Sequence, residues 1–295
     1  MIHYPNFTMR LMLSDYLKTF PQYIIPKHSL TTFAGFMANV KKTAIKNYLI
    51  KDFIKKYQVD MSEALQENPE QYASFNDFFI RHLKPDARPI APADIVSPVD
   101  GYVSEIGRIT AGKLIQAKGR DYTVQKLLAL EPAQNTQFDH GLFATLYLSP
   151  KDYHRVHMPL EATVKEMTYV PGKLFSVQPT TARVIPQLFA RNERLVVLFD
   201  TLIGPMAMVL VGATIVGGIG TSWHGDIIRQ RTPRHFDYSE SHDMNSILKK
   251  AQEMGYFKLG STVIVLFAEG HRLSWNEALK AGDRIRLGQA LASIN

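Results

Sequence analysis

Three short segments of the chain carry side chains that are suited to nucleophilic chemistry. They are Ser97-Pro-Val-Asp-Gly-Tyr-Val103, Tyr153-His-Arg-Val-His-Met-Pro159 and Phe257-Lys-Leu-Gly-Ser-Thr-Val-Ile-Val-Leu266. Taken singly, each segment has an ordinary explanation. The Asp-Gly pair is typical of a turn, and two nearby histidines can bind zinc, relay protons or satisfy local hydrogen bonds. Taken together, Asp100, the histidines and Ser261 supply the carboxylate, imidazole and hydroxyl that nucleophilic catalysis needs.

The position of Ser261 directly after Gly260 suggests an unusual target for that hydroxyl. A serine can attack the carbonyl group of its own preceding peptide bond. Glycine offers no side chain that would block the attack, and it tolerates strained backbone conformations. Self-cleavage between Gly260 and Ser261 is therefore one chemistry that the segment allows.

Other common chemistries lose their usual signatures in this sequence. The chain of 295 residues has no cysteine, which excludes disulfides, thiolate metal sites and cysteine nucleophiles. The motifs G-x-S-x-G, H-E-x-x-H, G-x-x-x-x-G-K-[ST] and G-x-G-x-x-G are also absent. With 45% hydrophobic and 21% charged residues, the chain as a whole is not disordered.

The elements that must position these groups are predicted to be mainly strands from residue 96 onward, where short apolar runs alternate with Gly, Pro and Asp turns. We expect strands over residues 101–106, 142–148, 162–170, 195–199, 207–215, 262–267 and 285–294, and helices over 124–129 and 243–253. Residues 201–220 are uncharged over a length that could span a bilayer. Their five glycines and Pro205 instead favour two buried strands.

A basic N-terminal region stands apart from a nearly neutral remainder. Residues 1–60 carry a net charge of +6, whereas the whole chain carries +7. Residues 9–57 are predicted to be helical, because apolar side chains recur every three or four residues beside six lysines at 41–56. This pattern fits a helix in a membrane interface, and equally a helix packed on the protein body. Nucleic acid is a third possible partner, but no nucleic-acid-binding module is recognisable.

The order and content of several segments resemble the bacterial (prokaryotic type I) phosphatidylserine decarboxylase proenzymes, a pyruvoyl-dependent family. The resemblance extends over nearly the whole chain. Besides the three segments above, it is carried by Phe75-Asn-Asp-Phe-Phe-Ile-Arg81, Tyr169-Val-Pro-Gly172, Phe189-Ala-Arg-Asn-Glu-Arg194 and Val211-Gly-Ala-Thr214. Several such segments in the same order are far more specific than any one of them.

The resemblance implies that the chain makes its own cofactor. In that mechanism Asp100 orients and charges His157, and His157 takes the proton of Ser261. The serine oxygen then attacks the carbonyl carbon of Gly260 and forms an ester. Elimination frees Gly260 as a new C-terminus, and hydrolysis leaves a pyruvoyl group at position 261 and ammonia. The products are a large chain of residues 1–260 and a small chain of residues 261–295.

The resemblance also implies the second reaction, the decarboxylation of phosphatidylserine to phosphatidylethanolamine and CO2. The pyruvoyl group receives the substrate amine and accepts the electron pair as CO2 leaves. His154 is the candidate general acid that protonates the substrate α-carbon. Phe175 and Ser176 are expected to line the substrate pocket. No metal ion is implied.

The expected fold is α+β, with amphipathic helices followed by a β-rich body related to the barrel-sandwich scaffold of lipoyl and biotinyl carriers. Residues 1–70 form the membrane-associating region and residues 71–295 the catalytic body. The family suggests a homodimer of the two processed chains, bound peripherally to anionic phospholipid at the cytoplasmic face of the bacterial inner membrane. No secretory signal is recognisable in the first 25 residues.

Two other functions are compatible with the residues alone. One is a processed decarboxylase that acts on a soluble amino-acid-like substrate. The other is a carrier or binding module on a barrel-sandwich scaffold, which would need an exposed lysine in a Met-Lys or Asp-Lys pair. The chain contains neither pair, and a scaffold does not fix a function.

Overall fold

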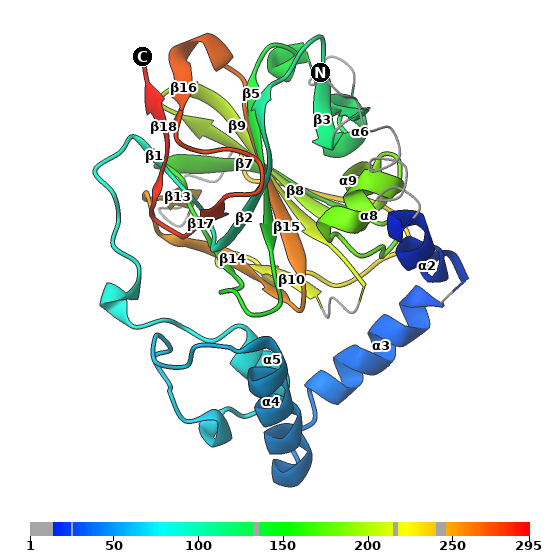
Figure 1. Cartoon of the computed structure of the whole chain (residues 1–295). Coiled ribbons are helices and arrows are strands. Elements are labelled where there is room, and N and C mark those ends of the chain that lie inside the picture. The colour runs from blue at the N-terminus through cyan, green and yellow to red at the C-terminus, as the bar shows by residue number, and fades with distance from the viewer. Residues whose placement is uncertain (1–13, 25, 118, 132–135, 215–217, 240–245) are drawn as a thin grey trace, which may run out of the picture.

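The computed structural model describes residues 14–24, 26–117, 119–131, 136–214, 218–239 and 246–295. Figure 1 shows a set of helices outside a body that is built mainly of strands. The predicted α+β class is therefore confirmed. The relation to barrel-sandwich hybrids stays a prediction, because the sheets of the body are open.

Helices form most of the described N-terminal part. The segments are α2 (Pro21–Ile24), α3 (Lys27–Ala38), α4 (Thr43–Tyr57), η1 (Pro69–Gln71), α5 (Phe75–Phe79) and η2 (Pro85–Ala87). Lys55 and Lys56 lie in the last turn of α4, where positive charge is favourable to the helix dipole. α5 begins after Ser74, whose hydroxyl accepts a hydrogen bond of 3.1 Å from the backbone N–H of Asp77.

A nine-stranded sheet forms the centre of the body. Its strand order is β12-β7-β8-β9-β15-β5-β2-β17, and β13 also pairs with β7. The strands are β2 (Gly101–Arg108), β5 (Leu142–Leu148), β7 (Ala162–Val170), β8 (Arg194–Thr201), β9 (Gly204–Gly212), β12 (Arg234–Asp237), β13 (Ile247–Leu248), β15 (Ser261–Phe267) and β17 (Arg284–Ile285).

The strand β15 lies inside this sheet, between β9 and β5, and pairs antiparallel with both along its whole length. All seven of its residues are buried. Val263, Val265 and Phe267 belong to the core on one face, while Ile264 and Leu266 belong to the core on the other. A strand buried on both faces is expected to be a continuous apolar run, and that is what this sequence shows.

The remaining strands form three smaller sheets. A four-stranded sheet has the order β11 (Gly225–Asp226), β10 (Gly218–Thr221), β14 (Glu253–Lys258) and β6 (Arg155–His157). A three-stranded sheet has the order β1 (Ile95–Val96), β18 (Ala290–Ile294) and β16 (Leu273–Trp275). The third sheet is the pair β3 (Lys113–Ala117) and β4 (Arg120–Thr123).

The short helices of the body cover one face of the nine-stranded sheet. They are α6 (Val124–Leu128), α8 (Pro179–Val184) and α9 (Leu188–Arg191), and the 3-10 turns are η3 (Thr136–Phe138) and η5 (Gly270–Arg272). Side chains of α6, α8 and α9 share a core with β9 and β15. The opposite face packs against side chains from the two smaller sheets that contain β14 and β18.

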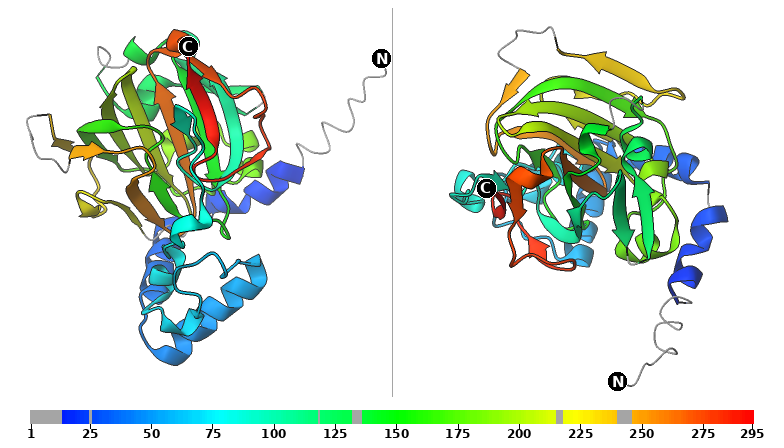
Figure 2. Two further views of the ribbon diagram at one scale, coloured as in Figure 1. Left: turned by 90° about the vertical axis from the view of Figure 1, so that its left-hand side faces the viewer. Right: turned by 90° about the horizontal axis from the view of Figure 1, so that it is seen from above.

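A third core, which we call the aromatic cluster, lies outside the sheets, where α4 and α5 pack together. Its buried members are Ala38, Ile50, Val59, Tyr72, Phe75, Phe78 and Phe79, and Phe53, Tyr57 and Leu259 are among the side chains packed against it. Figures 1 and 2 show α4 and α5 at one end of the molecule, below the sheets in both side views. The predicted domain boundary at residue 70 stays a prediction, although this cluster includes residues from both sides of it.

Most of the predicted strands agree with the structure, and one predicted helix does not. Residues 201–220 contribute to strands as interpreted, but to three and not two: the end of β8, all of β9 and the start of β10. The helix predicted over residues 243–253 is wrong where the structure describes it, because residues 247–248 form β13 and residue 253 begins β14. Within the described ranges, no helix is both long and apolar enough to cross a bilayer.

Candidate active site

The junction between β14 and β15 contains Gly260 and Ser261. Only Leu259 and Gly260 connect these two strands, which belong to different sheets. Both residues have positive φ, 80° at Leu259 and 55° at Gly260. A Cβ atom on Gly260 would meet no other atom within 4 Å, so conformation rather than space favours glycine there. The peptide bond before Ser261 thus lies in a strained turn.

Ser261 is fixed by the strand that it begins. It pairs with Leu148 of β5 and with Gly212 of β9, and it is fully buried. The Cβ atom at this position cannot move far, because both neighbouring strands hold the backbone. The serine hydroxyl is therefore presented at the end of the central strand, immediately beside the strained turn.

The ring of His154 contacts the Ser261 hydroxyl. Nδ1 of His154 lies 3.3 Å from Oγ of Ser261, and Nε2 lies 3.1 Å from the carbonyl oxygen of Ser149. A carbonyl oxygen can only accept, so Nε2 carries the hydrogen and Nδ1 accepts one from the serine hydroxyl. Burial, helped by the charge of Arg81, lowers the pKa of His154 to about 3. The imidazole is therefore neutral at physiological pH.

Two neighbouring groups fix the orientation of the His154 ring. Phe79 of α5 stacks on it, with 4.1 Å between the ring centroids and 28° between the planes. The carboxylate of Asp152 accepts hydrogen bonds from the backbone N–H of Ser149 at 2.8 Å and from its hydroxyl at 2.6 Å. Asp152 thereby holds the turn whose carbonyl oxygen binds His154.

His157 has different partners in this structure. Its Nδ1 donates to the carbonyl oxygen of Ala251 at 2.8 Å, and its Nε2 lies 3.2 Å from the hydroxyl of Tyr153. Burial lowers the pKa of His157, while the Ala251 carbonyl and the charges of Glu253 and Asp100 act in the opposite direction. The contact with Ser261 that the sequence analysis assigned to His157 is made here by His154.

Asp100 is held mainly by an arginine. Its carboxylate receives Nε of Arg88 at 2.9 Å and Nη2 at 2.5 Å, and it also accepts the backbone N–H of Leu287 at 2.9 Å. Asp100 is buried, so this bidentate pair neutralises its charge. The expected hydrogen bond from His157 to Asp100 is not formed in this arrangement.

A cavity of about 250 Å³ opens beside the Gly260–Ser261 bond. Its walls include Phe53 and Tyr57 of α4, Phe79 of α5, and Ser176. The predicted pocket residue Ser176 thus lies at the site. Phe175 is buried outside this wall, where it packs edge-on against Tyr23 of α2 at 5.6 Å. The aromatic walls make the cavity largely apolar.

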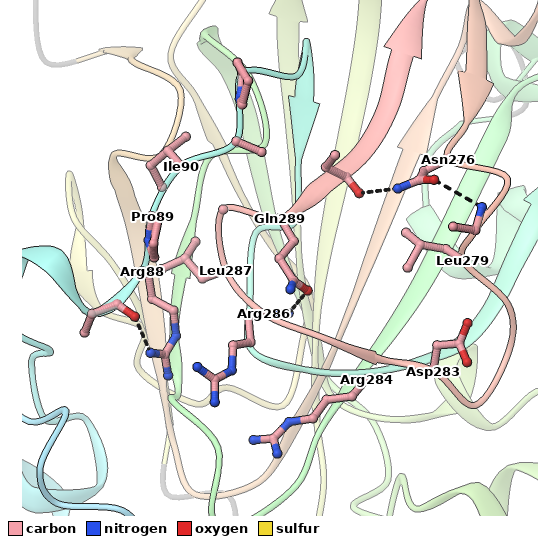
Figure 3. A pocket seen from close by; sticks show the side chains of 16 residues that line it. Arg88, Pro89, Ile90, Asn276, Leu279, Asp283, Arg284, Arg286, Leu287 and Gln289 are labelled. Carbon is pink, nitrogen blue, oxygen red and sulfur yellow. Dashed lines mark hydrogen bonds between the residues drawn. The ribbon is translucent and has the colours of Figure 1, made fainter.

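A wider groove of about 920 Å³ lies elsewhere, between residues 87–92 and 276–290, and contains none of the groups at Ser261. Figure 3 shows Arg88, Arg284 and Arg286 together along one edge of it. It is connected with the predicted site through Arg88 and Leu287, which both bind the carboxylate of Asp100. Across the described part of the chain, no three His, Asp or Glu side chains are arranged to hold a metal ion.

Several residues at the site were not identified from the sequence. Phe79 and Leu259 lie in segments that carry the resemblance, but an apolar side chain in such a segment looks like ordinary core. Asp152 stands two residues before His154, and a carboxylate so near a histidine is a usable signal in the sequence. Ser149 contributes through its backbone carbonyl, which no sequence pattern reveals.

Comparison with known proteins places this chain in a family. The family model for phosphatidylserine decarboxylase matches residues 75–293, and a second model, described as PSD, matches residues 17–58. A phosphatidylserine decarboxylase proenzyme from Legionella pneumophila (strain Philadelphia 1) is 59% identical over 283 residues, which cover 96% of this chain and 100% of that protein. Proteins with the same description from Acidovorax ebreus and Polaromonas sp. (strain JS666) are 49% and 48% identical over 95% of this chain, and over 98% and 99% of their own lengths.

Proposed function

The chain belongs to the phosphatidylserine decarboxylase family, and from that membership we propose a two-stage activity. The chain first cuts itself between Gly260 and Ser261, and it then converts phosphatidylserine to phosphatidylethanolamine and CO2. The observation that carries the first stage is the contact between His154 and the Ser261 hydroxyl beside a strained Leu259–Gly260 turn. A hydroxyl oriented in this way is adjacent to the carbonyl group that it must attack.

The proposed cut consists of three steps. The Ser261 oxygen bonds to the Gly260 carbonyl carbon, and the peptide nitrogen leaves with a proton, which gives an ester and a free amine. Removal of the α-proton of residue 261 then breaks the bond between its Cβ and the oxygen, which releases the Gly260 carboxylate. Water finally replaces the nitrogen of the resulting dehydroalanine, so ammonia leaves and a pyruvoyl group remains. No external protease is needed.

The two histidines are assigned different roles in this proposal. His154 orients the Ser261 hydroxyl, but with a pKa of about 3 it is a weak base at neutral pH. His157 takes the proton: burial lowers its pKa too, but the Ala251 carbonyl and the charges of Glu253 and Asp100 oppose that lowering. This assignment requires the His157 ring to exchange the Tyr153 hydroxyl for Ser261.

The residues at position 261 fit a pyruvoyl group. The group would end the buried strand β15 and face a cavity of about 250 Å³ with apolar walls. When present, a pyruvoyl group supplies an electrophilic carbonyl that binds the substrate amine and draws electrons as CO2 leaves. His154 faces that position through Nδ1. In this proposal Nδ1 first takes up a proton that the substrate amine releases on binding, and then donates it to the substrate α-carbon. Ser176, at the wall of the cavity, hydrogen-bonds the substrate head.

The substrate requires access to a lipid surface, and α2 and α3 offer one. Large apolar side chains on and near these helices are exposed, among them Phe20 at 61%, Phe33 at 62% and Phe36 at 68%. An apolar strip of this kind beside exposed lysines fits the surface of an anionic bilayer. The proposal places the protein peripherally on the cytoplasmic face of the bacterial inner membrane. We also propose that the two processed chains stay together and that two such pairs form a dimer.

An intact-mass measurement under denaturing conditions tests the first stage. Wild type should give two fragments, and the small one should have the mass of residues 262–295 plus a pyruvoyl end. The Ser261→Ala chain should remain whole under the same conditions. A wild-type chain that remains whole after prolonged incubation, or a small fragment that begins with an intact serine, would contradict the proposed chemistry.

A further inference from the structure

Leu259 adopts a backbone conformation that its side chain disfavours. Its φ is 80°, in the left-handed region where a Cβ atom crowds the backbone. Six described residues other than glycine have positive φ, and Leu259 is the one with a large apolar side chain. Such a conformation persists when surrounding contacts hold it. The question is therefore what holds Leu259.

The contacts that hold Leu259 come from the helices outside the sheets. Its side chain is partly buried and packs against the aromatic cluster formed by α4 and α5. It also lines the cavity beside Ser261 together with Phe53 and Tyr57 of α4. The leucine side chain is thus fixed on one side of the bond, while β15 fixes Ser261 on the other.

The same cluster also fixes the histidine that contacts Ser261. Phe79 belongs to the cluster and stacks on the His154 ring with centroids 4.1 Å apart. Phe53 meets Phe79 edge-on with 5.9 Å between the ring centroids. The side chains that contact Leu259 and the side chain that stacks on His154 are therefore parts of one packed cluster. A shift of α4 would displace both groups relative to the Ser261 oxygen.

We propose that Leu259 is a positioning residue for self-cleavage, held by the aromatic cluster so that the Gly260 carbonyl faces the Ser261 hydroxyl. The proposal rests on the proposed function, because it concerns the step in which the ester forms. Leu259 touches none of the reacting atoms through its side chain. It acts by fixing the turn that presents them.

The test follows the conversion of newly synthesised full-length chain into two fragments over time. Leu259→Ala keeps the Cβ atom and loses the contacts, so conversion should slow by at least about tenfold, as small misplacements of reacting groups do. Leu259→Met restores an apolar side chain of similar reach and should convert within about threefold of wild type. Leu259→Gly relieves the strain and removes the contacts, and it should be slow as well.

The controls separate positioning from loss of folding. Leu202→Ala removes an 89% exposed leucine and should leave conversion unchanged. In the uncut Ser261→Ala background, adding Leu259→Ala should leave the thermal unfolding midpoint nearly unchanged. Hydroxylamine cuts esters, so it should not restore cutting of Leu259→Ala if formation of the ester is the impaired step.

The outcomes distinguish this inference from the function on which it rests. If wild type never cuts, the proposed function fails. If wild type cuts and either Leu259→Ala or Leu259→Gly cuts equally fast, only the role of Leu259 is overturned. If Leu259 served folding alone, two results would appear together. The chain with both Leu259→Ala and Ser261→Ala would unfold at a lower temperature than the Ser261→Ala chain, and Leu259→Met would convert as slowly as Leu259→Ala. This pair of results would also overturn the proposal.

Discussion

At the scale of single residues, one backbone carbonyl determines which ring nitrogen of the neutral His154 carries the hydrogen. Because the Ser149 oxygen binds Nε2, the unprotonated nitrogen is the one that meets Ser261. The serine hydroxyl can then donate only in the direction of the histidine. This arrangement leaves the oxygen lone pairs free for attack, which is the geometry that a serine nucleophile needs.

The division of roles between the two histidines is tested by single substitutions. His154→Ala should still cut, more slowly because the hydroxyl is no longer oriented, and should then fail to decarboxylate. His157→Ala should remain whole, because the base is missing. Intact mass and CO2 release measure the two activities separately. A His154→Ala chain that never cuts, beside a His157→Ala chain that does, would exchange the assignments.

At this scale the sequence indicated the kinds of residue better than their contacts. The sequence predicts Asp100, His154, His157 and Ser261 as site residues, and the structure places His154 at Ser261. The hydrogen-bond partners were not predictable, because they depend on how β6 turns and on the Arg88 side chain, which reaches Asp100 from a segment before β1. Contacts between residues far apart in sequence have no local signal.

At the scale of elements, the helices α3 and α4 combine exposed apolar side chains with exposed lysines. Lys41, Lys42, Lys55 and Lys56 are exposed, whereas Lys46 is buried and donates to the carbonyl oxygen of Glu70 at 2.8 Å. The sequence predicts one basic surface from all six lysines, whereas the structure separates these four from Lys46 and Lys51, which both bind Glu70 of η1.

Replacement of these four exposed lysines by glutamine should weaken binding to vesicles that contain anionic lipid. Each lysine near such a surface contributes about 1 kcal/mol, so affinity should fall by two orders of magnitude or more. Vesicle sedimentation at fixed ionic strength provides the measurement. A matched variant with glutamine at Lys113, Lys126, Lys249 and Lys280, which are also exposed, should bind as wild type does. Equal losses in both variants would indicate a general charge effect instead of a docking surface.

Elements with strong periodicity were predicted well, and short ones were not. The strands at 142–148 and 162–170 match β5 and β7 at both ends, because their apolar runs are bounded by turn residues. The helix predicted over 243–253 failed, because pairing of residues 247–248 with β7 outweighs local helix preference. Tertiary contacts of this kind cannot be deduced from a window of sequence.

At the scale of the whole molecule, both products of the proposed cut remain parts of the same folded structure. The 35 residues from Ser261 to the end of the chain supply β15 to the nine-stranded sheet, β17 to its edge, and β16 and β18 to another sheet. The cut falls between β14 and β15 and breaks no strand pairing. The two chains should therefore remain associated without a covalent link.

The cut should nevertheless change how the molecule refolds. The uncut Ser261→Ala chain closes its sheets within one molecule, so its refolding yield after dilution from denaturant should not depend on protein concentration. The cut protein must bring two chains together, so its yield should rise with concentration. Circular dichroism after dilution at several concentrations measures both. A cut protein that refolds equally well at all concentrations would contradict this account.

The place of β15 between β9 and β5 also sets the working lifetime of the enzyme. A damaged small chain cannot be exchanged for a fresh one unless the central sheet is taken apart. Under the proposed chemistry, the group at position 261 is made once per molecule, from a serine that is consumed in making it. Activity lost at that residue is then replaced only by synthesis of a new chain, so the cell's capacity for this reaction follows its rate of protein synthesis.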